Sequence, residues 1–229
     1  MTRQFSTNKI KGREKMDNSK AVYLMISQTG TKFAKSIRKV GKQQYNHSSI
    51  SLDADLRRTF GFARPQHNAV LMGRLVRASL ERYTLGKDEP VEIAVFKIPV
   101  TDEQYDWIKG ELALRLNNKH YMYNLFSVLT YPFVKGYSVK DMYTCIEFVA
   151  YLMQHVGYLN DKPACKYTPD DLLVYFKDNI VYKGDIRNIM TYNPKNKSYF
   201  APMSMKVFVG NATALWNLIA RSFKALCGK

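Results

Sequence analysis

The sequence lacks the features that mark secreted and membrane-spanning proteins. Its three cysteines are widely separated, so they form neither a disulfide framework nor a CxxC metal site. No run reaches 18 consecutive apolar residues, which argues against a membrane-spanning helix. The first 20 residues are polar and have no signal-peptide hydrophobic region. We therefore expect a cytoplasmic protein in a reducing environment.

Several catalytic and cofactor-binding motifs are also missing. The chain has no Walker glycine loop, no GxGxxG after a predicted strand and no GxSxG elbow, which disfavours nucleotide-dependent and serine hydrolase chemistry. His67, His120 and His155 have no metal-ligand spacing with each other or with a cysteine. We expect neither a metal nor another cofactor.

Acidic residues are scarce at the two ends of the chain. Residues 1–43 contain 11 lysines and arginines against two acids, and residues 186–229 contain seven against none. Residues 44–185 are neutral, with 17 of each sign. Basic ends attract the phosphates of nucleic acid or anionic lipid, or serve only as solubilising tails. The neutral centre has no recognisable nucleic-acid motif, so nucleic acid is the less favoured partner.

Hydrophobic patterns typical of strands and of helices are interspersed along the chain. Strands are predicted at residues 21–28, 45–53, 59–64, 91–100 and 180–186, and helices at 31–40, 102–116, 138–156 and 169–176. Thr101 and Thr168 are predicted N-caps, and Gly157 is placed to end the third helix. The order lacks βαβ regularity and internal repeats, which favours an α+β fold.

One cysteine and one histidine stand out as candidates for chemistry. Cys145 lies early in a predicted apolar helix, where unpaired N–H groups and the helix dipole lower a thiol pKa. His47 lies on the polar face of the strand predicted at 45–53 and can project toward that helix. Structural alternatives stay open, because free cysteines are commonly small buried hydrophobes and strand histidines are commonly structural. The two residues are far apart in sequence, so only the fold can bring them together.

Two sequence blocks resemble a known enzyme family. Residues 45–64 (YNHSSISLDADLRRTFGFAR) and 143–158 (YTCIEFVAYLMQHVGY) are similar to the His and Cys blocks of permuted papain-like hydrolases of the YiiX/YaeF type. These are circularly permuted relatives of the NlpC-type cell-wall amidases, and in them the His strand precedes the Cys helix. The resemblance spans residues 20–185. It implies a permuted papain-like fold, with the central Cys-bearing helix packed on a mostly antiparallel sheet.

The same resemblance implies catalytic roles. Cys145 would be the nucleophile and His47 the general base, working through an acyl-enzyme intermediate. The backbone N–H of Cys145 would bind the oxyanion, with Tyr45 as the supporting side chain.

The sequence departs from the family at the residue that orients the imidazole. Where related sequences have a Tyr-Ser-Phe-Gly-Arg stretch, this chain has FGFAR, so the serine position is Gly61 and only Arg64 is matched. Arg64, Thr59 and His67 are the remaining candidates for the orienting role. A missing orienting residue would leave a dyad, and it raises the alternative of a catalytically degenerate member kept as a scaffold.

These implications divide the chain into a flexible basic arm (1–20), a permuted papain-like hydrolase domain (21–190) and a basic extension (191–229). We predict a thiol hydrolase of amidase or peptidase type, or an acyl hydrolase or transferase, acting on a peptide, a peptidoglycan fragment or a lipid. The rival from another class is a phosphate-binding module without catalysis.

The extension contains a predicted amphipathic helix with Asn211 as its cap. Its apolar face is formed by Leu215, Trp216, Ile219, Phe223 and Leu226, with basic residues nearby. Such a helix either packs on its own domain or lies on an anionic membrane surface.

Overall fold

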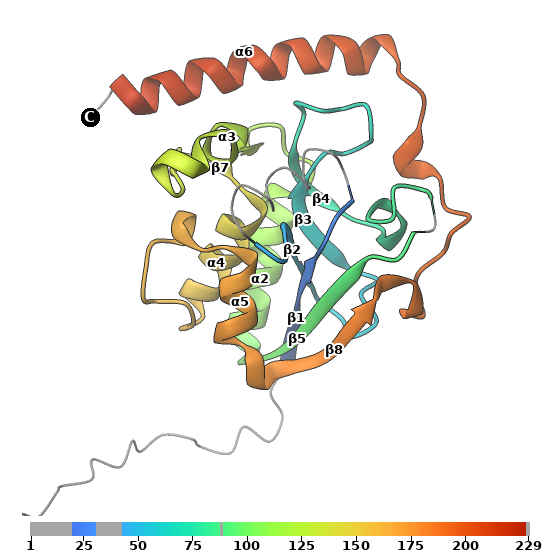
Figure 1. Ribbon diagram of the computed structural model, residues 1–229. Coiled ribbons are helices and arrows are strands. Elements are labelled where there is room, and N and C mark those ends of the chain that lie inside the picture. Colours follow the sequence, from blue (N-terminus) through green and yellow to red (C-terminus); the bar gives the residue numbers. More distant parts are fainter. Residues whose placement is uncertain (1–19, 31–42, 88, 228–229) are drawn as a thin grey trace, which may run out of the picture.

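The computed structural model describes residues 20–30, 43–87 and 89–227. The helix predicted at 31–40 and the basic arm predicted at 1–20, apart from Lys20, lie outside these residues. The described chain forms a six-stranded antiparallel sheet with helices packed around it (Figure 1). In spatial order its strands are β4 (Arg74–Arg77), β3 (Thr59–Ala63), β2 (His47–Ser51), β1 (Lys20–Ser27), β5 (Glu92–Val100) and β8 (Ile180–Asp185). The predicted α+β class and mostly antiparallel sheet are therefore confirmed.

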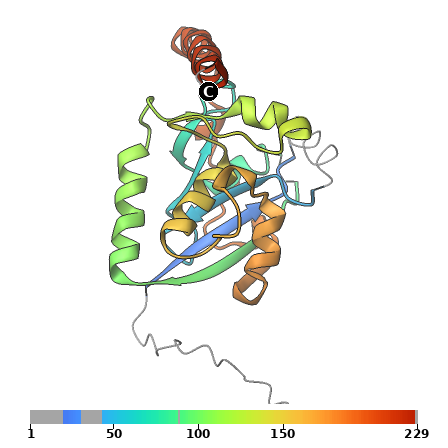
Figure 2. The ribbon, with the colours of Figure 1, turned by 90° about the vertical axis from the view of Figure 1, so that its left-hand side faces the viewer.

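Five α-helices occur among the described residues. They are α2 (Asp102–Arg115), α3 (Leu125–Val134), α4 (Cys145–His155), α5 (Pro169–Tyr175) and α6 (Met205–Cys227). Two short strands, β6 (Met122–Tyr123) and β7 (Met142–Tyr143), form a separate parallel pair just before α3 and α4. Helices α4 and α5 lie in front of the sheet in Figure 2, and α6 runs across the top of the molecule in Figure 1.

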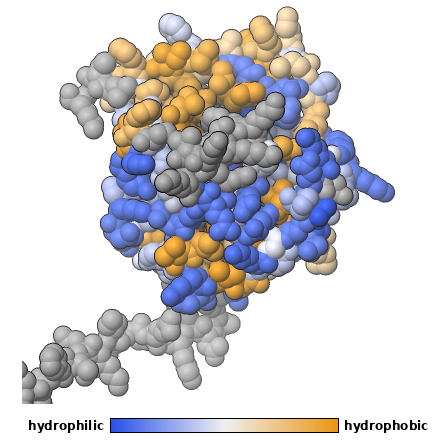
Figure 3. Space-filling model, in the orientation of Figure 1, coloured by the Kyte–Doolittle hydropathy of each residue, from blue (hydrophilic) through white to orange (hydrophobic). Residues whose placement is uncertain are grey.

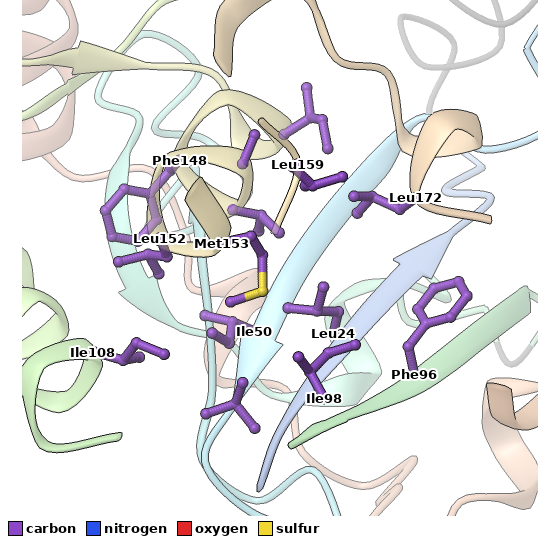
Figure 4. Close-up of a cluster of buried hydrophobic side chains, with 14 of the residues drawn as sticks. Leu24, Ile50, Phe96, Ile98, Ile108, Phe148, Leu152, Met153, Leu159 and Leu172 are labelled. Carbon is purple, nitrogen blue, oxygen red and sulfur yellow. The ribbon is translucent and has the colours of Figure 1, made fainter. Parts of the chain in front are cut away.

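The main core lies between α4 and one face of the sheet. Phe148, Leu152 and Met153 of α4 pack against strand residues that include Leu24 and Ile50, and all five are fully buried (Figure 4). Burying side chains of this size contributes about 1.5–3 kcal/mol each. This packing fixes α4, and with it the start of the helix, against β2.

A second cluster covers the opposite face of the sheet. Met25 of β1 and Val95 of β5 pack there with Leu80, Tyr83 and Ile186. Because successive strand residues point to opposite faces, β2 directs Ile50 toward α4 and directs His47, Ser49 and Ser51 toward this second face. The polar alternation predicted for β2 is therefore present.

Local capping explains where α4 begins. The Thr144 hydroxyl accepts the N–H of Glu147, and the Glu147 carboxylate accepts the N–H of Thr144, which is a capping box. The helix predicted at 138–156 was wrong at its start, because this box begins α4 at Cys145 and the preceding residues form β7. The predicted stop is confirmed, since Gly157 adopts a positive φ of 92°.

Helix α6 begins earlier than predicted. It starts at Met205, so Asn211 lies inside it and is not its cap. The Asn211 side chain instead accepts the N–H of Leu71 and donates to the carbonyl of Asn68, which ties α6 to the loop before β4. Among the described residues, no helix is both long and apolar enough to cross a membrane.

Candidate active site

Cys145 is the first residue of α4 and is 5% exposed. Its sulfur receives backbone N–H groups from Ile146, on its own helix, and from Ser48, on β2. The hydroxyls of Tyr123 and Ser48 also lie near the sulfur and act to lower its pKa. The thiol is thus surrounded by donors that would favour a thiolate.

Burial outweighs these donors. Removal from water raises the pKa of the Cys145 thiol, although the N–H and hydroxyl groups act in the opposite direction. The expected lowering of the thiol pKa at the helix start was therefore wrong in its net direction, and the resting residue is a neutral thiol.

His47 is the first residue of β2 and lies deep in the molecule, with part of its surface open to a cavity. Its ring packs against Tyr83, with 5.6 Å between ring centroids. A Cβ on Gly61 would lie 3.5 Å from Nε2 of His47. Gly61 therefore brings no side chain to Nε2.

The environment of His47 strongly disfavours its charged form. Burial, followed by the nearby positive charge of Arg82, lowers the pKa of His47 to about 3. The imidazole is therefore neutral across the physiological range. It has the protonation state of a base, but it is a weak one.

Strand separation brings β2 to the start of α4. β2 and β3 pair only at Ile50–Phe60 and Ser51–Thr59, so the strands diverge before His47 and Ser48. The Cys145 sulfur contacts Ser48, the residue next to His47. No hydrogen bond joins the thiol to the imidazole in the described structure, because His47 points to the face of the sheet opposite α4.

A cavity of about 630 Å³ opens beside these residues. Its polar lining comprises Thr29, Asn46, His47, Arg64, His67, Arg82 and Lys87, and its aromatic lining includes Tyr83, Tyr123 and Tyr199. Tyr123 lines the cavity and also lies near the Cys145 sulfur, whereas Cys145 itself is not part of the lining. Tyr123 therefore connects the cavity to the surroundings of the buried thiol.

The other predicted site residues are divided between the cavity and the core. Arg64 and His67 line the cavity. Thr59 is buried at the far end of β3, where its hydroxyl donates to the Leu56 carbonyl at 2.8 Å. Tyr45 precedes β2, and its hydroxyl donates to the Glu92 carboxylate at 2.7 Å, so it is not directed toward Cys145.

Three site residues carry no sequence signal of their own. Arg82 and Tyr83 belong to a short turn after β4, and Tyr123 belongs to the two-residue strand β6. None of them lies in a periodic pattern or a motif. Tyr123 reaches Cys145 because β6 pairs with β7, which leads directly into α4.

Glu147 is a further buried acid near the thiol. Burial raises its pKa to about 7, against hydrogen bonds from Ser138, the Thr144 N–H and Asn124. Its contacts to the N-cap give it a structural explanation.

The described residues contain no group of three or more His, Cys, Asp or Glu side chains that could hold a metal ion. Comparison of the chain with protein-family models, with curated proteins and with solved structures finds no match.

Proposed function

We propose that this protein is a cysteine-dependent acyl hydrolase or acyl transferase with a permuted papain-like fold. Cys145 is the nucleophile and His47 the general base. The observation that carries the proposal is the contact between the helix-start thiol and the beginning of the strand that bears His47, beside a cavity. The order of a His strand before a Cys helix on an antiparallel sheet supports the fold assignment.

The chemistry begins from a neutral pair. A substrate carbonyl enters the cavity, and the imidazole of His47 takes the thiol proton as the sulfur attacks the carbonyl carbon. The resulting tetrahedral intermediate expels an amine or alcohol, which receives the proton from His47. The acyl group stays on Cys145 until water or another acceptor attacks, with His47 again accepting the proton of the attacking group. The bond to sulfur then breaks, and the Cys145 thiolate leaves and regains its proton from His47.

This sequence requires the imidazole to reach the thiol. In the described structure His47 points to the face of the sheet opposite α4, so a movement of the His47 side chain toward Cys145 is part of the proposal. Gly61 places no side chain against the ring that would hold it in its present orientation.

The oxyanion would be bound by the backbone N–H of Cys145 and by the Tyr123 hydroxyl. Burial raises the pKa of Tyr123 well above its ordinary value, so the phenol keeps its proton and remains a donor. Loss of one such donor lowers kcat by about 10²–10³-fold. Tyr123 thus takes the supporting role that the sequence suggested for Tyr45.

Helix α6 favours a substrate found at a membrane surface. Trp216 and Phe223 are 73% and 66% exposed, on the side of the helix that faces away from the domain. Figure 3 shows hydrophobic residues gathered along the top of the molecule, where α6 runs. Lys224 follows directly, and residues 186–229 contain no acid. We propose that this surface binds an anionic membrane, which makes a lipid ester or lipopeptide a favoured substrate.

A catalytically inactive scaffold is the second candidate, and two observations favour it. Gly61 supplies no side chain to orient His47, and the resting thiol and imidazole are both in their less reactive states.

One experiment separates the two candidates. The protein is incubated with p-nitrophenyl butyrate, and intact and peptide mass spectrometry locate any acyl group. An acyl group on Cys145 that is absent from Cys145→Ala, and that forms much more slowly in His47→Gln and in Tyr123→Phe, supports the enzyme. Cys165→Ala is the matched control, because Cys165 lies on a short turn outside the cavity lining. Equal labelling of both cysteines, or labelling unaffected by either His47 or Tyr123 substitution, would leave the scaffold as the function.

A further inference from the structure

We propose that the cavity binds the carboxylate or phosphate group of an amphiphilic molecule through Arg82 and Arg64. This inference rests on the proposed function only where it calls that molecule the substrate; the binding itself does not require catalysis.

Arg82 is a buried cation without an acidic partner. It is 9% exposed, yet it lines the cavity. Its guanidinium donates to the carbonyl of Arg64 at 2.6 Å and stacks over the Tyr199 ring at 4.6 Å. Neither contact neutralises the charge, and no acid of the described chain forms an ion pair with it. Buried charges are almost always paired, so an unpaired one facing a cavity indicates an anionic ligand.

The neighbouring acid is already occupied. Glu81 is buried beside Arg82 in sequence, but its carboxylate accepts the N–H of Asn193 at 2.7 Å and the side-chain amide of Asn196 at 3.2 Å. These bonds anchor the segment after β8. Glu81 is not part of the cavity lining, which contains no Asp or Glu among the described residues.

Arg64 supplies a second positive charge at the same cavity. Its guanidinium donates to the carbonyl of His67 at 3.2 Å, and it too forms no ion pair within the described residues. The positive charge of Arg64 lowers the pKa of Tyr123, which lies near Cys145. The positive charge of Arg82 lowers the pKa of His47. An anion between the two guanidinium groups would therefore lie close to both halves of the proposed catalytic pair. Guanidinium forks bind carboxylate and phosphate oxygens in bidentate fashion.

The remainder of the cavity is suited to an apolar group. Its lining includes Phe62, Val70, Leu85, Leu125 and Leu129. Leu129 is also half exposed on α3, and the next turn of that helix presents the exposed Phe133. The cavity thus combines an apolar lining with two arginines that have no acidic partner among the described residues, whereas Lys87, the third cation of the lining, pairs with Glu89. An amphiphile with an acyl or alkyl chain and an anionic head matches both parts.

Binding of an anion would also change the proposed base. The positive charge of Arg82 is one reason why the pKa of His47 is low. A bound anion offsets that charge and favours protonation of the imidazole, which is the step that removes the thiol proton.

Isothermal titration calorimetry with four ligands below their micellar concentrations tests the proposal. The ligands are octanoate, octyl phosphate, octanol and inorganic phosphate. We expect saturable one-to-one binding of an anionic amphiphile, at least 10-fold tighter than octanol. The octanoate and octyl phosphate titrations identify which head group is preferred. Inorganic phosphate alone should bind more weakly than octyl phosphate, because it does not use the apolar lining. The proposal would be overturned if octanol bound as tightly as both anions, or if octyl phosphate bound no more tightly than inorganic phosphate.

Variants assign the binding to the two arginines. Arg82→Met and Arg64→Met should each weaken binding of the preferred anion by about 10- to 100-fold, the cost of losing a charge-assisted hydrogen bond. Arg77→Met is the matched control, because this exposed arginine bonds only the Arg57 carbonyl and does not line the cavity. If Arg82→Met does not fold, Arg64→Met still decides, since Arg64 makes a single side-chain hydrogen bond. Unchanged affinity in the folded variants contradicts the assignment.

Cys145→Ala distinguishes this inference from the proposed function. If the wild-type protein forms no acyl-enzyme but wild type and Cys145→Ala bind the anion equally, the anion site is supported and the catalytic proposal is removed. If the enzyme is active but the arginine variants bind all four ligands as tightly as the wild type, the catalytic proposal stands and the anion site is refuted.

Discussion

Gly61→Ser tests whether the missing orienting side chain limits His47. A Cβ at this position would lie 3.5 Å from Nε2 of His47 and 3.3 Å from Cβ of Ser49. The hydroxyl is one bond further, so it can approach Nε2 within an ordinary hydrogen-bond distance of about 2.7–3.0 Å. It would accept the Nε2 proton when the ring is charged, and this stabilises the imidazolium.

The size of the effect follows from one hydrogen bond. A net contribution of about 1 kcal/mol raises the pKa of His47 by roughly 0.7, since one pKa unit is about 1.36 kcal/mol. The same free energy, applied to thiol deprotonation in the transition state, increases the acylation rate by roughly 5-fold. Replacing a glycine within a strand stabilises the protein, whereas the close contact of the new Cβ with Ser49 destabilises it by a similar amount. We therefore expect little change in the free energy of unfolding.

Gly61→Ala is the matched control, because it adds the same Cβ without the hydroxyl. The imidazole nitrogens are followed by NMR from pH 2.5 to 8, and acylation of Cys145 by p-nitrophenyl butyrate is followed by mass spectrometry. We expect a titration near pH 3 in the wild type, a higher value in Gly61→Ser and no increase in Gly61→Ala. A wild-type His47 that titrates near the ordinary value of about 6.5 would refute the argument from burial and Arg82.

Three other predictions concern the Cys145 thiol, the buried Glu147 carboxyl and the exposed face of α6. Because burial raises the pKa of the Cys145 thiol, its alkylation by iodoacetamide should accelerate only above the ordinary thiol value of about 8.5. His47→Ala should leave that profile unchanged, since the imidazole is already neutral; rapid alkylation at pH 6, read by peptide mass spectrometry, contradicts this. At pH 8 the free energy of unfolding of Glu147→Gln, measured with urea, should exceed that of the wild type by roughly 2–3 kcal/mol. At pH 4 the two proteins should be equally stable. The raised pKa of about 7 means that the native state retains a proton which the unfolded state releases near pH 4.3, so wild-type stability falls as pH rises between these values; identical pH dependence in both proteins argues against a raised pKa. The double variant Trp216→Ser, Phe223→Ser should keep wild-type stability within about 1 kcal/mol, because both side chains are exposed. It should also lose co-sedimentation with phosphatidylglycerol vesicles, and retained binding would exclude this face of α6 as the membrane contact.

Most regular elements were predictable because their signals are local. The alternation around Ile50 identifies β2, and Thr101 and Thr168 form the capping boxes expected of helix starts. Elements held by distant partners were missed. β4 has four residues and depends on pairing with β3, and α3 lies next to a two-residue parallel pair whose strands are 20 residues apart. Neither leaves a periodic pattern in the sequence.

The candidate site was predictable in its residue types and less so in its arrangement. Cys145 was expected early in a helix and is its first residue, and Arg64 and His67 were expected near His47 and line the same cavity. Tyr45 was expected to share the His47 face, but the strand begins two residues later, so alternation does not apply to it. Arg82 could not be identified, because its importance comes from being buried without an acid, and burial is a property of the whole fold.

The pKa of the thiol shows why local reasoning about this site reaches a limit. A helix start does supply N–H groups, and the Ile146 N–H lowers the pKa of Cys145 as the sequence suggests. Burial, however, depends on how distant parts of the chain pack around Cys145, and removal from water outweighs the donors at Ile146, Ser48 and Tyr123. The same reasoning applies to His47, where burial and Arg82 act together. A pair held neutral in this way is inert until the surroundings change. The group that changes them most directly is an anion at Arg82, because it offsets the one positive charge known to act on the base. The proposed binding site and the proposed reaction therefore depend on the same arginine, and substrates with an anionic group should react faster than neutral analogues of equal size.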